Sequence, residues 1–123
     1  MRNICIGVPV LNSEYTVYVM LGDKKWACKS LKKWIEDDTI VIESFERIRG
    51  RCVTREGYLP HIYIALKPTD PHFWSTVSHE AVHAINFIWK VIGETSKDEV
   101  YAHSVGAIVF AVGQLLKNEK KKK

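Results

Sequence analysis

Hydrophobic and polar positions along the chain follow a two-residue repeat in some stretches and a helical repeat in others. Residues 15–20 are rich in β-branched and aromatic side chains and predict a strand, and residues 52–55 predict a shorter one. Residues 58–66 alternate strictly, so that one face of this strand holds Ile62, Ile64 and Leu66 and the other holds His61, Tyr63 and Ala65. Because Pro60 has no N–H to donate, we expect this strand, His61–Leu66, at an edge of the sheet.

Three segments have the helical repeat. Residues 24–35 place apolar side chains on one face and lysines on the other, and residues 72–89 are apolar over about half of their circumference. Residues 98–116 are apolar nearly all round, which predicts a buried C-terminal helix. Residues 39–45 are compatible with either a strand or a helix. Together these elements predict an α+β fold, with a small curved antiparallel or mixed sheet packed on helices.

Length and charge limit the protein to one domain. The chain has 123 residues, 46% of them hydrophobic, which is enough for one core and not two. Its net charge of +4 equals the charge of the last four residues, Lys120–Lys123, so the rest of the chain is neutral. We therefore expect a single domain over residues 1–117 and a basic disordered tail over 118–123. A neutral body argues against nucleic-acid binding, although the lysine tail keeps that alternative open.

The sequence favours a cytoplasmic protein. The three cysteines, Cys5, Cys28 and Cys52, are odd in number and far apart, as is typical of reduced thiols. The N-terminal residues lack the apolar stretch of a signal peptide. Residues 100–116 carry no charge and precede lysines, so a tail anchor is an alternative, but their polar residues favour a core helix and no membrane association. We expect a monomer or a weak dimer.

The motif His79-Glu80-Ala81-Val82-His83 carries the clearest chemical signal in the chain. On a helix, residues four apart lie on one face, so both imidazoles can reach one metal ion. Glu80 lies at the border of that face, where its carboxylate can hold a water molecule bound to the metal. The motif therefore indicates a zinc peptidase with one Zn²⁺ ion, in which Glu80 acts as the general base.

Such a site needs a third protein ligand, and the next helix offers two candidates. Glu99 and His103 share one stripe of that helix. In a straight antiparallel pair of helices, His83 would lie opposite about Gly106, and Glu99 would be about 10 Å from the level of His83. His103 is better placed in that arrangement, so both candidates remain open at this point.

The motif and the stretch Asp98-Glu99-Val100-Tyr101-Ala102 resemble the small gluzincin metallopeptidases, including the ImmA/IrrE-type minigluzincins. Short bacteriophage proteins with a His-Glu-Ala-Val-His-Ala motif are similar over residues 58–112, and a viral source would mean the host-cell cytoplasm. The resemblance implies that His79, His83 and Glu99 bind zinc. It also implies that the strand His61–Leu66 lines the cleft and pairs with an extended peptide or protein substrate.

Three further side chains are candidates to stabilise the oxyanion of the reaction: His103, Tyr101 and, more weakly, Tyr63. A zinc-dependent metallopeptidase is the function that the sequence favours. One alternative is a non-catalytic interaction or regulatory protein of bacteriophage type on the same scaffold. The other is a nucleic-acid-associated protein that uses its lysine tail.

Overall fold

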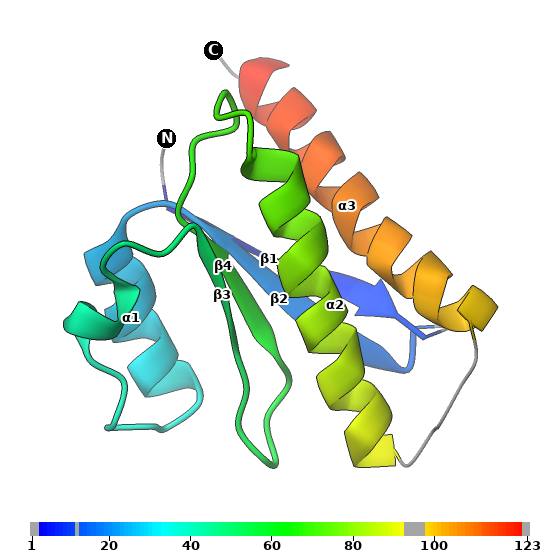
Figure 1. The fold of residues 1–123 in the computed structure, drawn as a ribbon, viewed down its shortest axis with the longest axis horizontal. Coiled ribbons are helices and arrows are strands. Elements are labelled where there is room, and N and C mark those ends of the chain that lie inside the picture. The colour runs from blue at the N-terminus through cyan, green and yellow to red at the C-terminus, as the bar shows by residue number, and fades with distance from the viewer. Residues whose placement is uncertain (1–2, 12, 93–97, 122–123) are drawn as a thin grey trace.

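The computed structural model describes residues 3–11, 13–92 and 98–121, the last range without the side chains of residues 98 and 99 (Figure 1). The fold is α+β, as predicted, with one mixed four-stranded sheet and three helices. In chain order the elements are β1 (Ile4–Val10), β2 (Tyr15–Leu21), α1 (Lys24–Trp34), the 3-10 turn η1 (Ile42–Phe45), β3 (Gly50–Val53), β4 (His61–Ile64), α2 (Phe73–Ile92) and α3 (Asp98–Lys121).

The strands lie in the order β1-β2-β4-β3. β1 is antiparallel to β2 and β3 is antiparallel to β4, whereas β2 and β4 are parallel. The crossover between the two parallel strands contains α1, η1 and β3. β1 and β3 are therefore the edge strands.

The prediction that the strand beginning at His61 lies at an edge is wrong. β4 lies between β2 and β3, and all four of its residues are buried. Pro60 is compatible with this position because it precedes the first residue of β4 and contributes only its carbonyl oxygen, which accepts from the Tyr18 N–H at 3.1 Å. The predicted alternation of faces is confirmed, since Ile62 and Ile64 pack toward α2 while Tyr63 packs toward α1.

β1 was not predicted, although its sequence alternates. Val8 and Val10 are buried, while Gly7 and Pro9, which alternate with them, are exposed. Proline is tolerated here because β1 is an edge strand with only one hydrogen-bonded neighbour.

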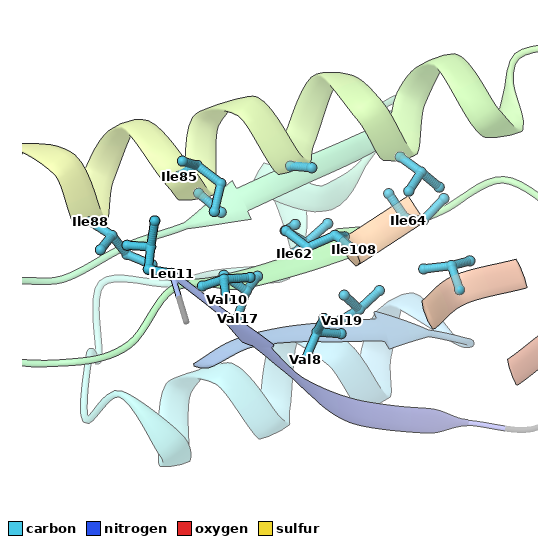
Figure 2. Packing of buried hydrophobic residues seen from close by; sticks show 14 of the residues in the cluster. Val8, Val10, Leu11, Val17, Val19, Ile62, Ile64, Ile85, Ile88 and Ile108 are labelled. Atoms are coloured by element: carbon cyan, nitrogen blue, oxygen red, sulfur yellow. The ribbon is translucent and has the colours of Figure 1, made fainter. Parts of the chain in front are cut away.

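Helices cover both faces of the sheet. Figure 2 shows valines of β1 and β2 and isoleucines of β4 packed against Ile85 and Ile88 of α2 and Ile108 of α3. On the other face, α1 and η1 bury a second cluster that includes Leu31, Phe45 and Tyr63. α1 begins as expected with Asp23, whose carboxylate accepts from the Trp26 N–H at 3.1 Å and caps the helix.

α3 is buried along a narrower stripe than its apolar sequence predicts. Among its described side chains only Ser104, Ile108 and Val112 are buried, and Phe110 is 67% exposed. Residues 100–121 are long and apolar enough to cross a bilayer by length and composition, with 17% of the most apolar window buried. The helix runs to Lys121, so the domain end predicted at residue 117 falls inside α3 and residues 118–121 are helical.

Candidate metal centre

The predicted motif lies on the central turns of α2, as expected. The chain enters this helix through Asp70, whose side chain accepts from the His72 N–H at 2.8 Å and whose carbonyl accepts from the Phe73 N–H at 3.0 Å. These two bonds satisfy N–H groups that have no partner within the helix. From there α2 runs unbroken to Ile92, which places His79 and His83 on consecutive turns.

The two motif histidines point their outer ring nitrogens at each other. His79 Nε2 and His83 Nε2 are 3.1 Å apart, and the rings are nearly perpendicular, at 82°. Two nitrogen ligands of a tetrahedral zinc ion, each 2.0–2.1 Å from the metal, are about 3.3 Å apart. The observed separation is within a few tenths of an ångström of that value. The two nitrogens share a hydrogen bond, so the protonated one would have to lose its proton and both rings would have to turn toward the metal for the pair to bind zinc.

Glu80 lies between two grooves along α2. The His83 groove has a volume of about 690 Å³ and is lined by Gly50, Arg51, Cys52, Thr54, Glu80, His83, Asn86, Phe87, Trp89 and Lys90. The His79 groove has a volume of about 530 Å³ and is lined by Arg47, Ile48, Arg49, Gly50, Ser75, Thr76, His79 and Glu80. Glu80 belongs to both grooves and is only 7% exposed, whereas both histidines are exposed. Glu80 is therefore a largely buried acid that lines a groove with each of the two histidines.

The wall opposite Glu80 is the edge strand β3, and Gly50 allows α2 to lie against it. A Cβ at Gly50 would be 2.6 Å from Thr76 Cγ2, 3.1 Å from the Tyr63 carbonyl oxygen and 3.2 Å from Glu80 Cγ. Real Cβ atoms essentially never come within 3.0 Å of another heavy atom, so only glycine fits here. Gly50 was not predicted as part of the site. A glycine opening a short strand indicates a close backbone approach, which is the signal that could have identified it.

Cys52, two residues further along β3, is the other unpredicted residue of the site. Burial, and to a lesser extent the nearby charge of Glu80, raises the pKa of its thiol to about 12. The thiol is therefore neutral at physiological pH. It supplies a weakly polar wall beside Glu80 in the His83 groove.

α3 packs antiparallel to α2 with a register that two contacts define. The Tyr101 hydroxyl donates to the Asn86 side-chain oxygen at 3.0 Å, and a Cβ at Gly113 would be 3.8 Å from the Trp74 ring. Ser104 is therefore level with His83, rather than Gly106 as expected. The backbone of residue 99 lies level with residue 88, five residues from His83 and about 7.5 Å along the axis. The offset of Glu99 is thus smaller than the sequence indicated.

The predicted site residues are only partly brought together. His79 and His83 lie together, and Glu80 lines one groove with each of them. The Tyr101 hydroxyl lies one turn from His83, where it also donates to the Val82 carbonyl at 3.2 Å. The side chain of Glu99 lies outside the described residues. His103 is exposed, and no three histidines, cysteines or acids within the described ranges are grouped closely enough to share a metal ion.

Tyr63 is excluded as an oxyanion donor. Its hydroxyl donates to the Gly22 carbonyl at 2.8 Å, within the cluster packed against α1 on the opposite face of the sheet. Burial, and secondarily the charge of Asp23, raises the pKa of this hydroxyl to about 12. The suggestion that Tyr63 faces the reaction is therefore wrong.

Comparison with protein-family models, with curated protein sequences and with solved structures finds no match for this chain. The resemblance to the small gluzincins therefore stays a prediction that rests on the motif.

Proposed function

We propose that this protein is a zinc-dependent metallopeptidase, in which His79 and His83 hold the metal and Glu80 is the general base. The observation that carries the proposal is the 3.1 Å separation of the two Nε2 atoms, beside a buried carboxylate that opens into two grooves. An ordinary amphipathic helix with two surface histidines would not also hold a glutamate, 7% exposed, against an edge strand.

Glu99 is the third ligand that we propose, and His103 is the alternative. Both lie on the helix that packs against α2. The observed register brings residue 103 to within about 1.5 Å and residue 99 to within about 7.5 Å of the level of His83. His103 is thus nearer in level, and Glu99 is proposed first because residues 98–102 resemble the ligand stretch of the small gluzincins. A carboxylate with two imidazoles leaves one position of a tetrahedral site open for water, as zinc hydrolases require.

When bound, zinc would lower the pKa of a coordinated water and polarise a peptide carbonyl. The Glu80 carboxylate accepts the proton of the attacking water and returns it to the leaving nitrogen. Its burial against Gly50 limits its rotamers, so the carboxylate is oriented before substrate arrives. Tyr101 and His103 are the proposed donors to the oxyanion, and the Tyr101 hydroxyl would exchange its bonds to α2 for one to substrate.

The substrate strand that we propose lies along β3 rather than β4. β3 has only one neighbour in the sheet, so the outer edge of Gly50–Val53 offers main-chain donors and acceptors to an extended peptide. This edge borders the grooves that Glu80 lines, whereas β4 is enclosed on both sides.

Metal analysis of the purified chain and of its variants tests the proposal. We expect about one zinc per chain, retained in Glu80→Gln but lost in the double variant His79→Ala/His83→Ala. His72→Ala is a matched control, because this histidine is exposed just before α2 and outside both grooves. Glu80→Gln should abolish cleavage of a mixed peptide library that the wild-type protein cleaves.

The same variants separate the alternatives. A wild-type protein that holds no zinc, or whose zinc survives the loss of both histidines, contradicts the proposal. Retention of zinc with full cellular function in Glu80→Gln would instead favour a non-catalytic interaction protein. Loss of zinc in Glu99→Gln but not in His103→Gln would assign the third ligand.

A further inference from the structure

The two grooves beside the histidine pair are lined by cations. Arg47 and Arg49 line the His79 groove, and Arg51 and Lys90 line the His83 groove. Among the described side chains, Glu80 is the only acidic residue that lines either groove. Since the chain without its last four lysines has no net charge, this concentration of positive charge is local to the candidate site.

Four arginines occur within nine positions of this segment, and they fall into two classes. Arg51 donates to the Ser44 hydroxyl at 2.6 Å and lies over the Phe45 ring, 5.1 Å from its centroid. Arg55 donates to the Ile35 carbonyl at 2.8 Å and lies over the Tyr58 ring. These two guanidinium groups hold η1 and the end of α1 in place, so they have a structural role.

Arg47 and Arg49 have no such role. Both are exposed, and within the described part of the chain neither side chain makes an ion pair, a hydrogen bond or a ring contact. Arg47 also has φ +62°, a left-handed conformation that side-chain-bearing residues rarely adopt. A glycine would relieve that strain, so the fold gains nothing from an arginine at this position.

β3 and α2 run alongside each other in the same direction. Residues 47–50 line a groove with residues 75–80, and residues 50–54 line one with residues 80–90. A peptide extended along the edge of β3 would therefore have one end at Arg47 and Arg49. Its other end would lie near Lys90, beside the apolar ring of Phe87.

We infer that this cleft selects acidic peptide segments, with an aspartate or glutamate of the ligand bound by Arg47 and Arg49. The inference rests on the proposed function, because it names the substrate class of the same site. Guanidinium groups bind carboxylates in a bidentate manner, and low-dielectric groove walls concentrate the field of several cations. A peptide is favoured over a nucleic acid because the outer edge of β3 offers main-chain donors and acceptors that match a peptide backbone.

Binding of labelled peptides to the full chain tests the inference. Three fluorescein-labelled twelve-residue peptides share a neutral centre and carry four Glu, four Gln or four Lys residues in the same flanking positions. Fluorescence anisotropy is measured with a chelator present, so that no peptide is cleaved. At low salt we expect the Glu peptide to bind about tenfold tighter than the Gln peptide, with the gap shrinking as salt rises.

Charge-matched variants locate the effect. Arg47→Gln/Arg49→Gln should remove the difference in affinity between the Glu and Gln peptides. Arg47→Gly should weaken binding of the Glu peptide without lowering the midpoint of thermal unfolding. Lys25→Gln/Lys29→Gln changes the net charge equally on exposed positions of α1, across the sheet, and should leave the gap unchanged.

Equal affinity for the Glu and Gln peptides, or an unchanged gap in the double arginine variant, overturns the inference. A single-stranded oligonucleotide also overturns it if it displaces the labelled Glu peptide as well as unlabelled Glu peptide does, when both competitors are added at the same concentration of negative charge. These readouts do not require zinc or turnover, so failure of the proposed function would appear in the metal and cleavage experiments and not here. A zinc peptidase without preference for acidic peptides would refute only this inference.

Discussion

Replacing Gly50 with alanine should force apart the edge strand and the metal-site helix. The added Cβ would be 2.6 Å from Thr76 Cγ2, against an ordinary contact distance of 3.4–4 Å, so a gap of about an ångström must open. Two neighbours limit the relief, because the Tyr63 carbonyl at 3.1 Å belongs to the adjacent strand and Glu80 Cγ at 3.2 Å to α2. Overpacking of this kind costs about 1–3 kcal/mol. For a domain of this size that corresponds to a fall of about 4–12 °C in the midpoint of thermal unfolding.

Calorimetry of Gly50→Ala, Thr76→Ser and the double variant measures the effect. Thr76→Ser removes the methyl group that clashes, so the double variant should be more stable than the sum of the single changes implies, by about 0.5–1 kcal/mol. Gly106→Ala is the matched control, since a Cβ there meets open space on α3 and alanine is the better helix former by up to about 1 kcal/mol. Unchanged stability in Gly50→Ala, or strict additivity in the cycle, would refute the argument that α2 rests directly on the backbone of β3.

Three further predictions concern the rest of the fold. Burial lowers the pKa of His61 below its ordinary value of 6.5, so the unfolded chain takes up a proton more readily than the folded one. The free energy of unfolding should therefore be highest above about pH 6.5 and fall as the pH decreases below that value. Urea titrations of His61→Gln should show a weaker dependence of this free energy on pH. Ser104→Ala should cost about 1–2 kcal/mol in urea unfolding, because the buried Leu11 N–H that donates to its hydroxyl at 3.3 Å loses its acceptor; no loss would mean that water replaces it. Ile108→Ala should lower the free energy of unfolding by about 2–5 kcal/mol because Ile108 is buried, whereas Phe110→Ser, at an exposed position of the same helix, should change it by less than about 0.5 kcal/mol. Equal effects would show that the two faces of α3 do not differ in burial.

The helices and the motif were predictable because each depends on local periodicity. α2 begins one residue after the predicted start and ends three residues beyond the predicted end, and α1 begins at the predicted residue. The histidine pair follows from helix geometry alone, since residues four apart must lie on one face. The α+β class followed in turn from the mixture of the two repeats.

The order of the strands was not predictable from the same signals. Pro60 was taken as a mark of an edge strand, but a proline just before a strand costs the ladder nothing, because its carbonyl oxygen still accepts from Tyr18. The better signal was in the residues of β4 itself, where both faces are apolar or aromatic, as is typical of a central strand covered on both sides. Because β4 lies inside the sheet, β3 is the edge strand next to Glu80.

The completeness of the metal centre depends on tertiary register, which the sequence does not encode locally. The expected alignment of His83 with Gly106 assumed a symmetrical hairpin of straight helices. The contact of Tyr101 with Asn86 shifts that alignment by two residues, toward Ser104. The arginines beside the motif were missed for a related reason, because exposed cations in a segment without clear periodicity resemble any solvated surface until the fold brings them to α2.

The contact between β1 and α3 has a consequence for the way this chain is made. The hydrogen bond from Leu11 to Ser104 joins positions 93 residues apart, and Ile108 and Val112 pack in the same cluster as Val8 and Val10 of the first strand. During synthesis, the hairpin of β1 and β2 leaves the ribosome long before the helix that covers it exists. Its valines must stay in contact with solvent or with a chaperone until α3 has left the ribosome, so we expect the sheet to fold slowly and only after α3 has been synthesised.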